Sequence, residues 1–287
     1  MTRTTLTTGA NSGIGLATTL HLARLGFRSI GSVRSPAKAE ELVKAAAEAG
    51  VEVEALVIDL TDEAAWSEAL AGVDLYGLIN NAGYMNVGAI EDVDADEALA
   101  QLEAMVVTPM RLARLVLPGM RQCREGRIVN VSSVFAHVTP PMLGWYGAAK
   151  HALAAVSAAL RSEVAASGID VVLIEPGGID TNIWNKAERE LERRRPGSAY
   201  EAAYDRSLRI LRTLRGRMTD PAKVAEVIGE ALTSGHPKNH YRVGLDAGPV
   251  ALANQLLPAS VKDVLGRTVL GLGRRTRPPP TAPSSTG

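Results

Sequence analysis

The stretch Thr8-Gly9-Ala10-Asn11-Ser12-Gly13-Ile14-Gly15 decides the fold of this chain. It follows a short β-branched run, Thr4–Thr8, that predicts a strand, and it opens an apolar-periodic segment through Leu25 that predicts a helix. Glycine-rich turns are also common as plain connections between a strand and a helix. In this order, however, the glycines let the backbone approach a phosphate, and the amides at the helix start attract an anion. The stretch therefore predicts a site for dinucleotide phosphates, formed by residues of the turn: Gly9, Asn11, Ser12, Gly13, Ile14 and Gly15.

Strand and helix patterns alternate along the rest of the chain. The further predicted strands are short, apolar runs at Phe27–Val33, Val53–Asp59, Leu75–Ile79, Arg127–Val131, Asp170–Glu175 and Tyr241–Leu245. The further predicted helices are Ala37–Ala49, Ala98–Met120 with an irregularity at Pro109, and Asp220–Leu232. This alternation predicts an α/β fold, a doubly wound parallel sheet of about seven strands with helices on both faces.

Composition narrows the class of protein. The 31 basic and 31 acidic side chains cancel, so no global charge draws the chain to nucleic acid. No apolar stretch is long enough for a membrane span, and the start of the chain does not resemble a secretory signal. A single cysteine, Cys123, excludes an internal disulfide and fits a reducing compartment. We therefore expect a cytoplasmic location, and we expect Cys123 to fill a small buried space.

The end of the second predicted strand indicates which dinucleotide is bound. No acidic residue lies between Ser29 and Ala39, where a carboxylate would hold the adenosine ribose and repel a 2′-phosphate. Arg34 stands there instead, with Ser32, Ser35 and Lys38 nearby in sequence. An arginine fork suits a phosphate, so NADP(H) is favoured and NAD(H) is possible. A solvated arginine at a helix start is the alternative interpretation.

Two further strand ends carry polar or small residues that would line the same crevice. Asp59 and Leu60 end the third predicted strand, where Asp59 could accept a hydrogen bond from the adenine amino group or cap the next helix. Residues 80–83, Asn-Asn-Ala-Gly, close the fourth predicted strand. We expect Asn81, Ala82 and Gly83 to face the cofactor.

Tyr146 and Lys150 stand four residues apart at the start of an alanine-rich run that predicts a helix. Positions four apart lie on one helix face, so the phenol and the ammonium would share one space. A nearby positive charge favours the phenolate, and we therefore expect the Tyr146 pKa to be lowered. Such a tyrosine can give a proton to a carbonyl oxygen or take one from an alcohol. The spacing alone is weak, because the same pair is frequent in ordinary helices.

Together these motifs resemble the short-chain dehydrogenase/reductase family in its compact single-domain form, over about residues 4–185. The order is the family's: the glycine turn, Asn80 to Gly83, Ser133 thirteen residues before Tyr146, and then Lys150, with Pro-Gly-Gly-Ile-Asp-Thr at residues 176–181. The resemblance implies a Rossmann-like fold. It also implies one NAD(P)-binding domain over residues 1–273, with a substrate lid at 182–217, a C-terminal extension at 218–273 and a disordered tail at 274–287.

The resemblance also implies roles for the matching residues. Tyr146 would be the general acid/base, Lys150 would lower its pKa and hold the nicotinamide ribose, and Ser133 would hydrogen-bond the substrate oxygen. Cofactor contacts are further implied in the motif that follows the sixth strand: Pro176, Gly177, Ile179 and Thr181. Asn81 would lie on the ribose side. No metal is implied.

One position departs from the family pattern. Met105 stands where the family usually has an asparagine that bends the long helix and anchors a proton-relay water. Methionine hardly accepts a hydrogen bond. Either a water finds another anchor, the relay runs differently, or turnover is slow. A dinucleotide-binding sensor with weakened catalysis is the alternative function.

The substrate side is less marked in the sequence. The loop before Tyr146 contains Phe135, Met142 and Trp145, which form an apolar substrate wall or ordinary loop packing; Trp184 is a further candidate. Residues 182–217 include an amphipathic helix with Tyr200, Tyr204, Leu208 and Leu211 on its apolar side. Residues 250–272 are apolar and predict one or two helices near the lid or in a subunit contact, with membrane-surface attachment as an alternative.

These observations lead to one reading. We expect an NADP(H)-dependent oxidoreductase, a carbonyl reductase that interconverts a secondary alcohol and a ketone on an apolar or amphipathic small molecule. By family habit, we also expect a homodimer or homotetramer.

Overall fold

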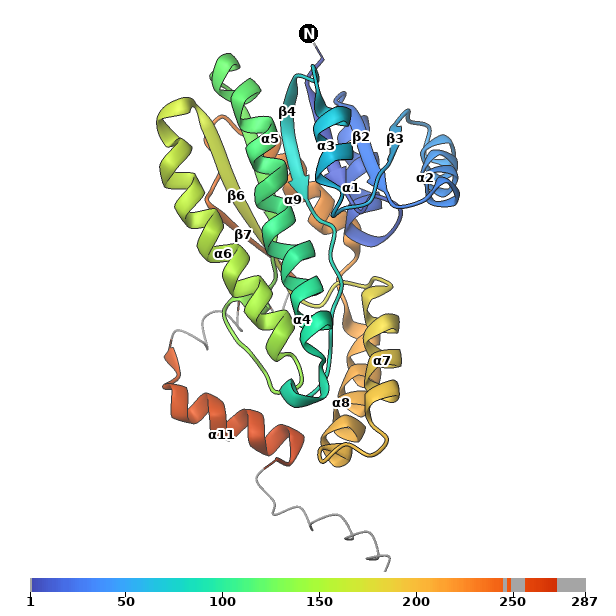
Figure 1. The fold of residues 1–287 in the computed structure, drawn as a ribbon, viewed down its shortest axis with the longest axis vertical. Coiled ribbons are helices and arrows are strands. Elements are labelled where there is room, and N and C mark those ends of the chain that lie inside the picture. Colours follow the sequence, from blue (N-terminus) through green and yellow to red (C-terminus); the bar gives the residue numbers. More distant parts are fainter. Residues whose placement is uncertain (1, 245–246, 249–255, 273–287) are drawn as a thin grey trace, which may run out of the picture.

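One parallel sheet of seven strands organises the molecule (Figure 1). The structure, a computed structural model, describes residues 2–244, 247–248 and 256–272. The strands are β1 Thr4–Thr8, β2 Arg28–Val33, β3 Glu54–Val57, β4 Leu75–Asn80, β5 Gly126–Val131, β6 Ile169–Pro176 and β7 His240–Val243. Their order across the sheet is β3-β2-β1-β4-β5-β6-β7, as a doubly wound sheet requires. The predicted fold class is confirmed.

The strand order reverses between β1 and β4. β1 pairs with β2 on one side, where Thr8 lies opposite Ser32, and with β4 on the other, where Thr7 lies opposite Ile79. The connections that leave β1 and β4 therefore run to opposite sides of the sheet. A crevice at the carboxyl ends of the strands follows from this divergence, and it is the usual ligand site of such sheets.

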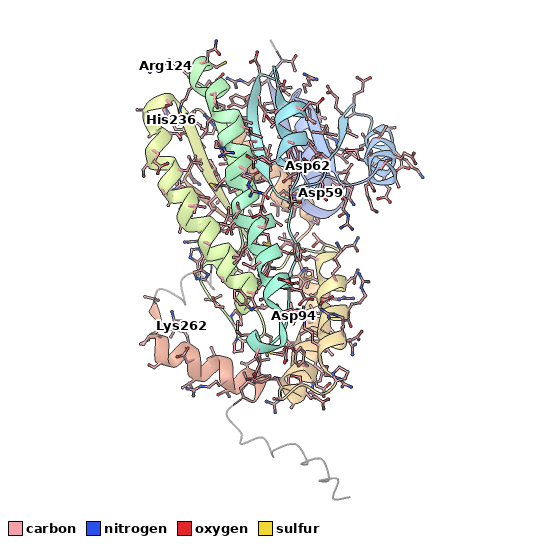
Figure 2. All side chains as sticks on the ribbon, in the orientation of Figure 1. Asp59, Asp62, Asp94, Arg124, His236 and Lys262 are labelled. Atoms are coloured by element: carbon pink, nitrogen blue, oxygen red, sulfur yellow. The ribbon has the colours of Figure 1, made fainter. Side chains whose placement is uncertain are left out.

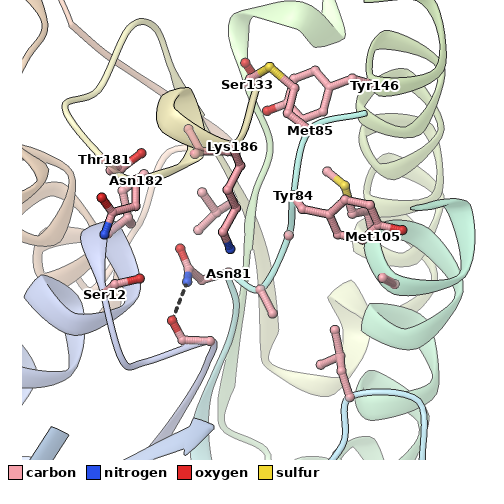
Figure 3. Close-up of a pocket in the computed structure, with 18 of the residues that line it drawn as sticks. Ser12, Asn81, Tyr84, Met85, Met105, Ser133, Tyr146, Thr181, Asn182 and Lys186 are labelled. Atoms are coloured by element: carbon pink, nitrogen blue, oxygen red, sulfur yellow. Dashed lines mark hydrogen bonds between the residues drawn. The ribbon is translucent and has the colours of Figure 1, made fainter. Parts of the chain in front are cut away.

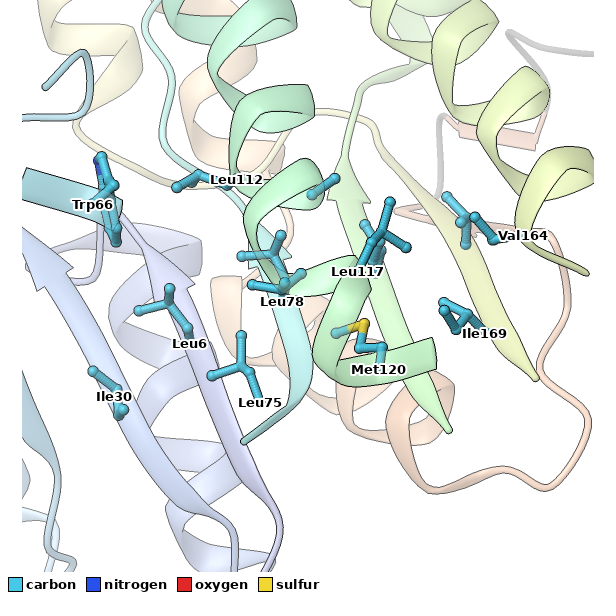
Figure 4. Close-up of a cluster of buried hydrophobic side chains, with 14 of the residues drawn as sticks. Leu6, Ile30, Trp66, Leu75, Leu78, Leu112, Leu117, Met120, Val164 and Ile169 are labelled. Carbon is cyan, nitrogen blue, oxygen red and sulfur yellow. The ribbon is translucent and has the colours of Figure 1, made fainter. Parts of the chain in front are cut away.

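One face of the sheet is covered by α3 Glu63–Leu70, α5 Thr108–Cys123 and α6 Gly144–Val164. The side chains between them and the strands form one of the main core clusters (Figure 4). Trp66 from α3, Leu112 from α5 and Leu78 from β4 are at most 1% exposed. Burial of side chains of this size contributes about 2 kcal/mol each, so this layer fixes α5 and α6 firmly against the sheet.

The opposite face is covered by α1 Gly13–Arg24, α2 Pro36–Glu48 and α9 Pro221–Thr233. Leu22 of α1 and Ile228 of α9 are fully buried against β4, β5 and β6. Asp220 caps α9 by accepting a hydrogen bond from the Ala222 amide, and the predicted helix after Asp220 is confirmed.

The long helix expected at Ala98–Met120 is not continuous. It consists of α4 Ala95–Leu102, a π-helical turn Glu103–Val107 and α5. Pro109 has no N–H, so the Met105 carbonyl four residues earlier lacks its helical donor and the turn widens before the proline. The expected irregularity is present, and it places Met105 in the widened turn.

Beyond the carboxyl ends of the strands lie the helices α7 Ile183–Arg194, α8 Glu201–Leu214 and α11 Ala259–Leu270 (Figure 1). The expected apolar side of α8 is buried at Tyr204, Leu208 and Leu211, whereas Tyr200 precedes the helix. α11 lies near α8, and Leu270 joins the core cluster beneath it. The predicted tail at 274–287 lies outside the described residues, and the division into lid and extension stays a prediction.

Cys123 corrects one expectation. It is exposed at the end of α5, beside Arg124, whose left-handed backbone ends the helix (Figure 2). The last turn of α5 projects past the edge of the core, so the cysteine fills no buried space. In the described part of the chain, no helix combines the length and apolarity that crossing a bilayer would need.

Candidate active site

A cavity of about 920 Å³ opens at the carboxyl ends of the strands, where the strand order reverses (Figure 3). It is continuous from the glycine turn, past the ends of β2, β4, β5 and β6, to α6 and α7. The cavity therefore joins the candidate phosphate site to the candidate catalytic side chains.

The glycine turn is built from close backbone contacts. Gly9 has φ +68° and Gly13 has φ +53°, conformations that L residues rarely adopt. A Cβ at Gly15 would overlap the Gly9 carbonyl. Ser12 precedes α1 without capping it through its side chain, so amides at the helix start are left for a ligand. Gly9, Asn11, Ser12 and Ile14 line the cavity, whereas Gly13 and Gly15 support the turn from behind.

Asn81 and Thr8 hold this turn against the end of β4. The Asn81 side-chain amide donates to the Thr8 carbonyl over 2.9 Å and to the Gly9 carbonyl over 3.5 Å (Figure 3). The Thr8 hydroxyl accepts hydrogen bonds from the backbone amides of Asn81 and Ala82, each over 3.0 Å. Asn81, Ala82 and Gly83 line the cavity as expected, but the side chain of Asn81 is directed to the glycine turn.

At the end of the cavity near β2, one cation makes no hydrogen bond to a carboxylate of the described residues. Arg34 is exposed there and lines the cavity with Asp59 and Leu60. Lys38 is paired with Glu41 over 2.8 Å. The Asp59 carboxylate accepts from the Thr61 hydroxyl over 2.7 Å and from its amide over 2.9 Å. These hydrogen bonds lower the Asp59 pKa, with a smaller contribution from Arg34.

The three candidate catalytic residues converge in the cavity. Tyr146 and Lys150 lie one turn apart on α6, and the Lys150 ammonium is 5.6 Å from the centre of the Tyr146 ring. Ser133, at the end of β5, hydrogen-bonds the Tyr146 hydroxyl. The Lys150 ammonium donates to the Val131 carbonyl over 2.8 Å. All three side chains belong to residues that are 6% exposed. The sequence-predicted set is thus brought together in one place.

The titration of this pair differs from the expectation. Burial raises the Tyr146 pKa to about 12, and the hydrogen bond with Ser133 opposes this only in part. Burial lowers the Lys150 pKa to about 7. Removing either group from water disfavours its charged form, and this cost dominates both shifts. The expected lowering of the Tyr146 pKa is therefore wrong.

Met105 fills the space beneath the Asn-Asn-Ala-Gly segment. It is 2% exposed, it lines the cavity, and its terminal methyl carbon would lie 3.4 Å from a Cβ at Gly83 (Figure 3). The Met105 side chain therefore makes apolar contacts at the widened turn, where the family's asparagine would supply an amide group.

The substrate candidates divide into two groups. Phe135 lines the cavity, and its ring meets Tyr146 edge-on with 5.9 Å between ring centres. Trp184 also lines the cavity, and its indole donates to the Ile179 carbonyl over 2.7 Å. Met142 and Trp145 do not line it. Met142 has a positive φ of 71°, and its side chain packs in the core cluster that contains the apolar side of α8. For Met142, the alternative of ordinary loop packing therefore describes the structure.

Pro176, Gly177, Ile179 and Thr181 line the cavity as expected. Several lining residues were not anticipated: Tyr84 and Met85 after β4, Glu97 on α4, and Lys186, Arg189 and Glu190 on α7. The side of α7 that faces the cavity cannot be told from a solvent-exposed helix face in the sequence, because charged residues occur both in water and at the lining of a polar cavity. Among the described residues, no three His, Cys, Asp or Glu side chains form a group that could hold a metal ion.

The glycine turn, the uncapped helix start and the free arginine fit a dinucleotide. The buried hydroxyl, phenol and amine beside them fit proton transfer to or from an oxygen atom.

Known proteins agree with this chemistry. The short chain dehydrogenase family model matches residues 3–192. The chain is 35% identical over 265 residues to the uncharacterized oxidoreductase YusZ of Bacillus subtilis, covering 89% of this chain and 94% of the relative. It is 31% identical over 285 residues to human retinol dehydrogenase 5, covering 92% and 87%.

A solved structure with NADPH, a variant of the actinorhodin polyketide ketoreductase, matches with a TM-score of 0.73 and 27% identity, over 86% of this chain and 97% of that one. The sheet order, the converging side chains and these matches lead to one conclusion: the chain belongs to the short-chain dehydrogenase family and is an NAD(P)-dependent oxidoreductase.

Proposed function

We propose that the protein is an NADP(H)-dependent oxidoreductase that interconverts a secondary alcohol and a ketone on an apolar or amphipathic substrate, with Tyr146 as general acid/base. The observation that carries this proposal is the convergence of Ser133, Tyr146 and Lys150 in one cavity with the glycine turn.

In the reductive direction, the Tyr146 hydroxyl donates its proton to the carbonyl oxygen, and the Ser133 hydroxyl donates a hydrogen bond to the same oxygen. The cofactor, when bound, supplies the hydride that the carbonyl carbon accepts. Lys150 in its protonated form stabilises the phenolate left on Tyr146. Oxidation of the alcohol reverses these proton movements.

Arg34 supports a preference for NADP(H). Its guanidinium is the exposed cation at the end of β2, and the neighbouring Lys38 is already paired with Glu41. The ketoreductase of similar fold carries NADPH. We expect Arg34→Ser to weaken NADPH binding about tenfold or more, since charge-assisted hydrogen bonds are worth roughly 2 kcal/mol. NADH binding should be unchanged, and equal losses for both would argue against this role.

The lining near Tyr146 supports an apolar or amphipathic substrate. Met85, Met105, Phe135 and Trp184 present apolar side chains, with charged residues of α7 at the rim. The retinol dehydrogenase relative is named for an apolar alcohol. A panel in which only small hydrophilic sugars turned over would contradict the substrate class.

Assembly into a homodimer or homotetramer is part of the proposal. A sensor with weakened catalysis is the second candidate, because the buried Met105 offers no amide at a position where the family usually has one.

The deciding experiment measures NADPH oxidation with a panel of ketones for the natural protein and for Tyr146→Phe. We expect ketone-dependent oxidation that falls about a thousandfold in the variant, the scale of general acid catalysis. NADPH binding should be retained, which shows that the cavity is intact. Retained activity in Tyr146→Phe would overturn the mechanism, and binding without turnover in the natural protein would favour the sensor.

A further inference from the structure

One lysine of the lid reaches into the cavity from the side opposite the glycine turn. Lys186 lies in the first turn of α7 and lines the cavity. Figure 3 shows its ammonium extended toward Asn81, whose amide holds the turn. The start of α7 is fixed there, because a Cβ at Gly13 would lie 2.9 Å from the Thr181 methyl carbon. The backbone that carries the lysine is therefore held next to the phosphate site, and the lysine itself is exposed.

The local charges leave this ammonium without a counter-ion. A cation in the first turn of a helix is disfavoured by the helix dipole, yet neither α1 nor α7 has an acidic residue in its first turn. Among the described residues, Lys186 makes no ion pair. An anion between α1 and α7 would neutralise both helix starts and the lysine.

Of the three carboxylates in the cavity lining, Glu97 and Glu190 are paired with arginines, and Asp59 at the end of β3 accepts from Thr61. Glu97 pairs with Arg193 over 2.8 Å and with Arg194 over 2.6 Å. Glu190 pairs with Arg193 over 2.7 Å and with Arg194 over 3.2 Å. The charge that remains near Lys186 is thus positive, which suits a polyanion lying along the glycine turn.

We propose that Lys186 binds the diphosphate of the dinucleotide from the lid side, opposite the amides of the glycine turn. This deepens the proposed function and rests on it. The contact joins α7 to the cofactor, so a bound dinucleotide holds the lid over the cavity. Lys186 is a binding residue here and takes no part in the proton transfer.

A second cation on the same helix defines the competing possibility. Arg189 follows Lys186 by three residues, so it lies on the same side of α7, and it also lines the cavity. An anionic group on the substrate could use either side chain. The two ligands are separated by measuring cofactor binding without any substrate.

The test is a calorimetric titration of the full-length protein with NADPH and with adenosine 2′-monophosphate, which lacks the diphosphate. We expect Lys186→Gln to weaken NADPH binding tenfold to a hundredfold, because one charge-assisted contact is lost. Binding of adenosine 2′-monophosphate should change less than twofold, and Lys186→Arg should recover most of the NADPH affinity. Lys223→Gln, which removes a surface cation of α9 outside the cavity, should have no effect.

The outcomes are separable. Unchanged NADPH affinity in Lys186→Gln, or an equal loss for both ligands, overturns the inference. If Lys186→Gln leaves NADPH binding intact and raises only the KM of anionic ketones, the lysine serves the substrate and the diphosphate assignment fails. If the natural protein binds neither ligand, the proposed function itself fails.

Discussion

Two buried tyrosines stand in very different surroundings. Tyr146 in the catalytic corner and Tyr204 on α8 both have their pKa raised to about 12, mainly by burial. The Tyr204 hydroxyl donates to Asp92 over 2.8 Å and accepts from the Ala89 amide over 3.1 Å. The Tyr146 hydroxyl has Ser133 as a partner and lies beside the open cavity.

The cations beside them differ in the same way. Arg194, whose side chain is 4% exposed, pairs with Glu97 and Glu190 and donates to the Asp92 carbonyl. Lys150 is equally buried, and the partner of its ammonium is the neutral Val131 carbonyl. The buried charge of Arg194 is matched by two carboxylates, so removing one partner of these pairs is costly. In the catalytic corner the charge is unmatched, and such sites are where shifted pKa values serve chemistry.

The largest expected effect comes from removing the unmatched cation. Lys150→Met should lower carbonyl reduction about a thousandfold, because no charge then stabilises the Tyr146 phenolate. The variant should nevertheless be more stable at pH 7, since a buried amine is replaced by an apolar side chain of similar size. Urea unfolding and NADPH oxidation on the same preparations test both statements.

The gain in stability should depend on pH in a defined direction. The folded-state pKa of Lys150 is about 7, below the usual lysine pKa of 10.5, so the unfolded chain binds a proton that the folded chain does not. The stability of the natural protein should therefore rise between pH 7 and 10.5, by about 1.4 kcal/mol per pH unit at most. Lys150→Met lacks this rise, so its advantage should shrink across the window. An exposed control, Lys44→Met, should follow the natural protein; a constant advantage would contradict the burial argument.

Removing the paired cation Arg194 should have the opposite effect: stability should fall while catalysis is kept. Arg194→Met leaves Glu97 and Glu190 without their buried partner, and we expect the free energy of unfolding to fall by about 3 kcal/mol. The chemical step should be retained, because Tyr146 and Ser133 are untouched. Arg195→Met, which removes a half-exposed cation paired with Asp205, is the matched control and should change stability little. A variant as stable as the natural protein would show that the pairing does not hold the lid.

The pH profile of reduction offers a third test. The kcat/KM for NADPH reports groups of the enzyme without cofactor. Lys150 loses its proton near pH 7, so this quantity should fall above pH 7 and approach a tenfold decrease per unit. The residual activity of Lys150→Met should show no such fall. A flat profile in the natural protein would mean that the lysine charge does not assist Tyr146.

The sequence carried most of the fold and the main site. The glycine turn and the Tyr146–Lys150 pair depend on short spacings within one turn or one helix face, and such spacings survive any packing. Ser133 is identified by the family's spacing of thirteen residues to Tyr146. The direction of the Tyr146 pKa shift could not be obtained in this way, because it depends on how deeply distant elements bury the hydroxyl. Sequence proximity to Tyr146 likewise suggested Met142, whose backbone turns its side chain into the core.

The inner face of α7 shows a different limit. Lys186 and Arg189 have the helical spacing of a solvated face, and nothing local distinguishes water from a cavity on that side. The close approach of Thr181 to Gly13 decides that this side of α7 faces the cavity, because it sets α7 against the glycine turn.

The smallest expected effect compares the two tyrosines directly. Tyr204→Phe leaves the Ala89 amide and the Asp92 carboxylate without their hydroxyl partner, so the free energy of unfolding should fall by roughly 2 kcal/mol. Its kcat should stay near that of the natural protein, because the hydroxyl lies outside the cavity lining. Tyr146→Phe removes a hydroxyl beside open space, and stability should change less while activity is lost. If both variants lost stability equally and kept activity equally, the distinction between a matched and an unmatched tyrosine would not hold, because the same burial would then have the same consequence in both regions.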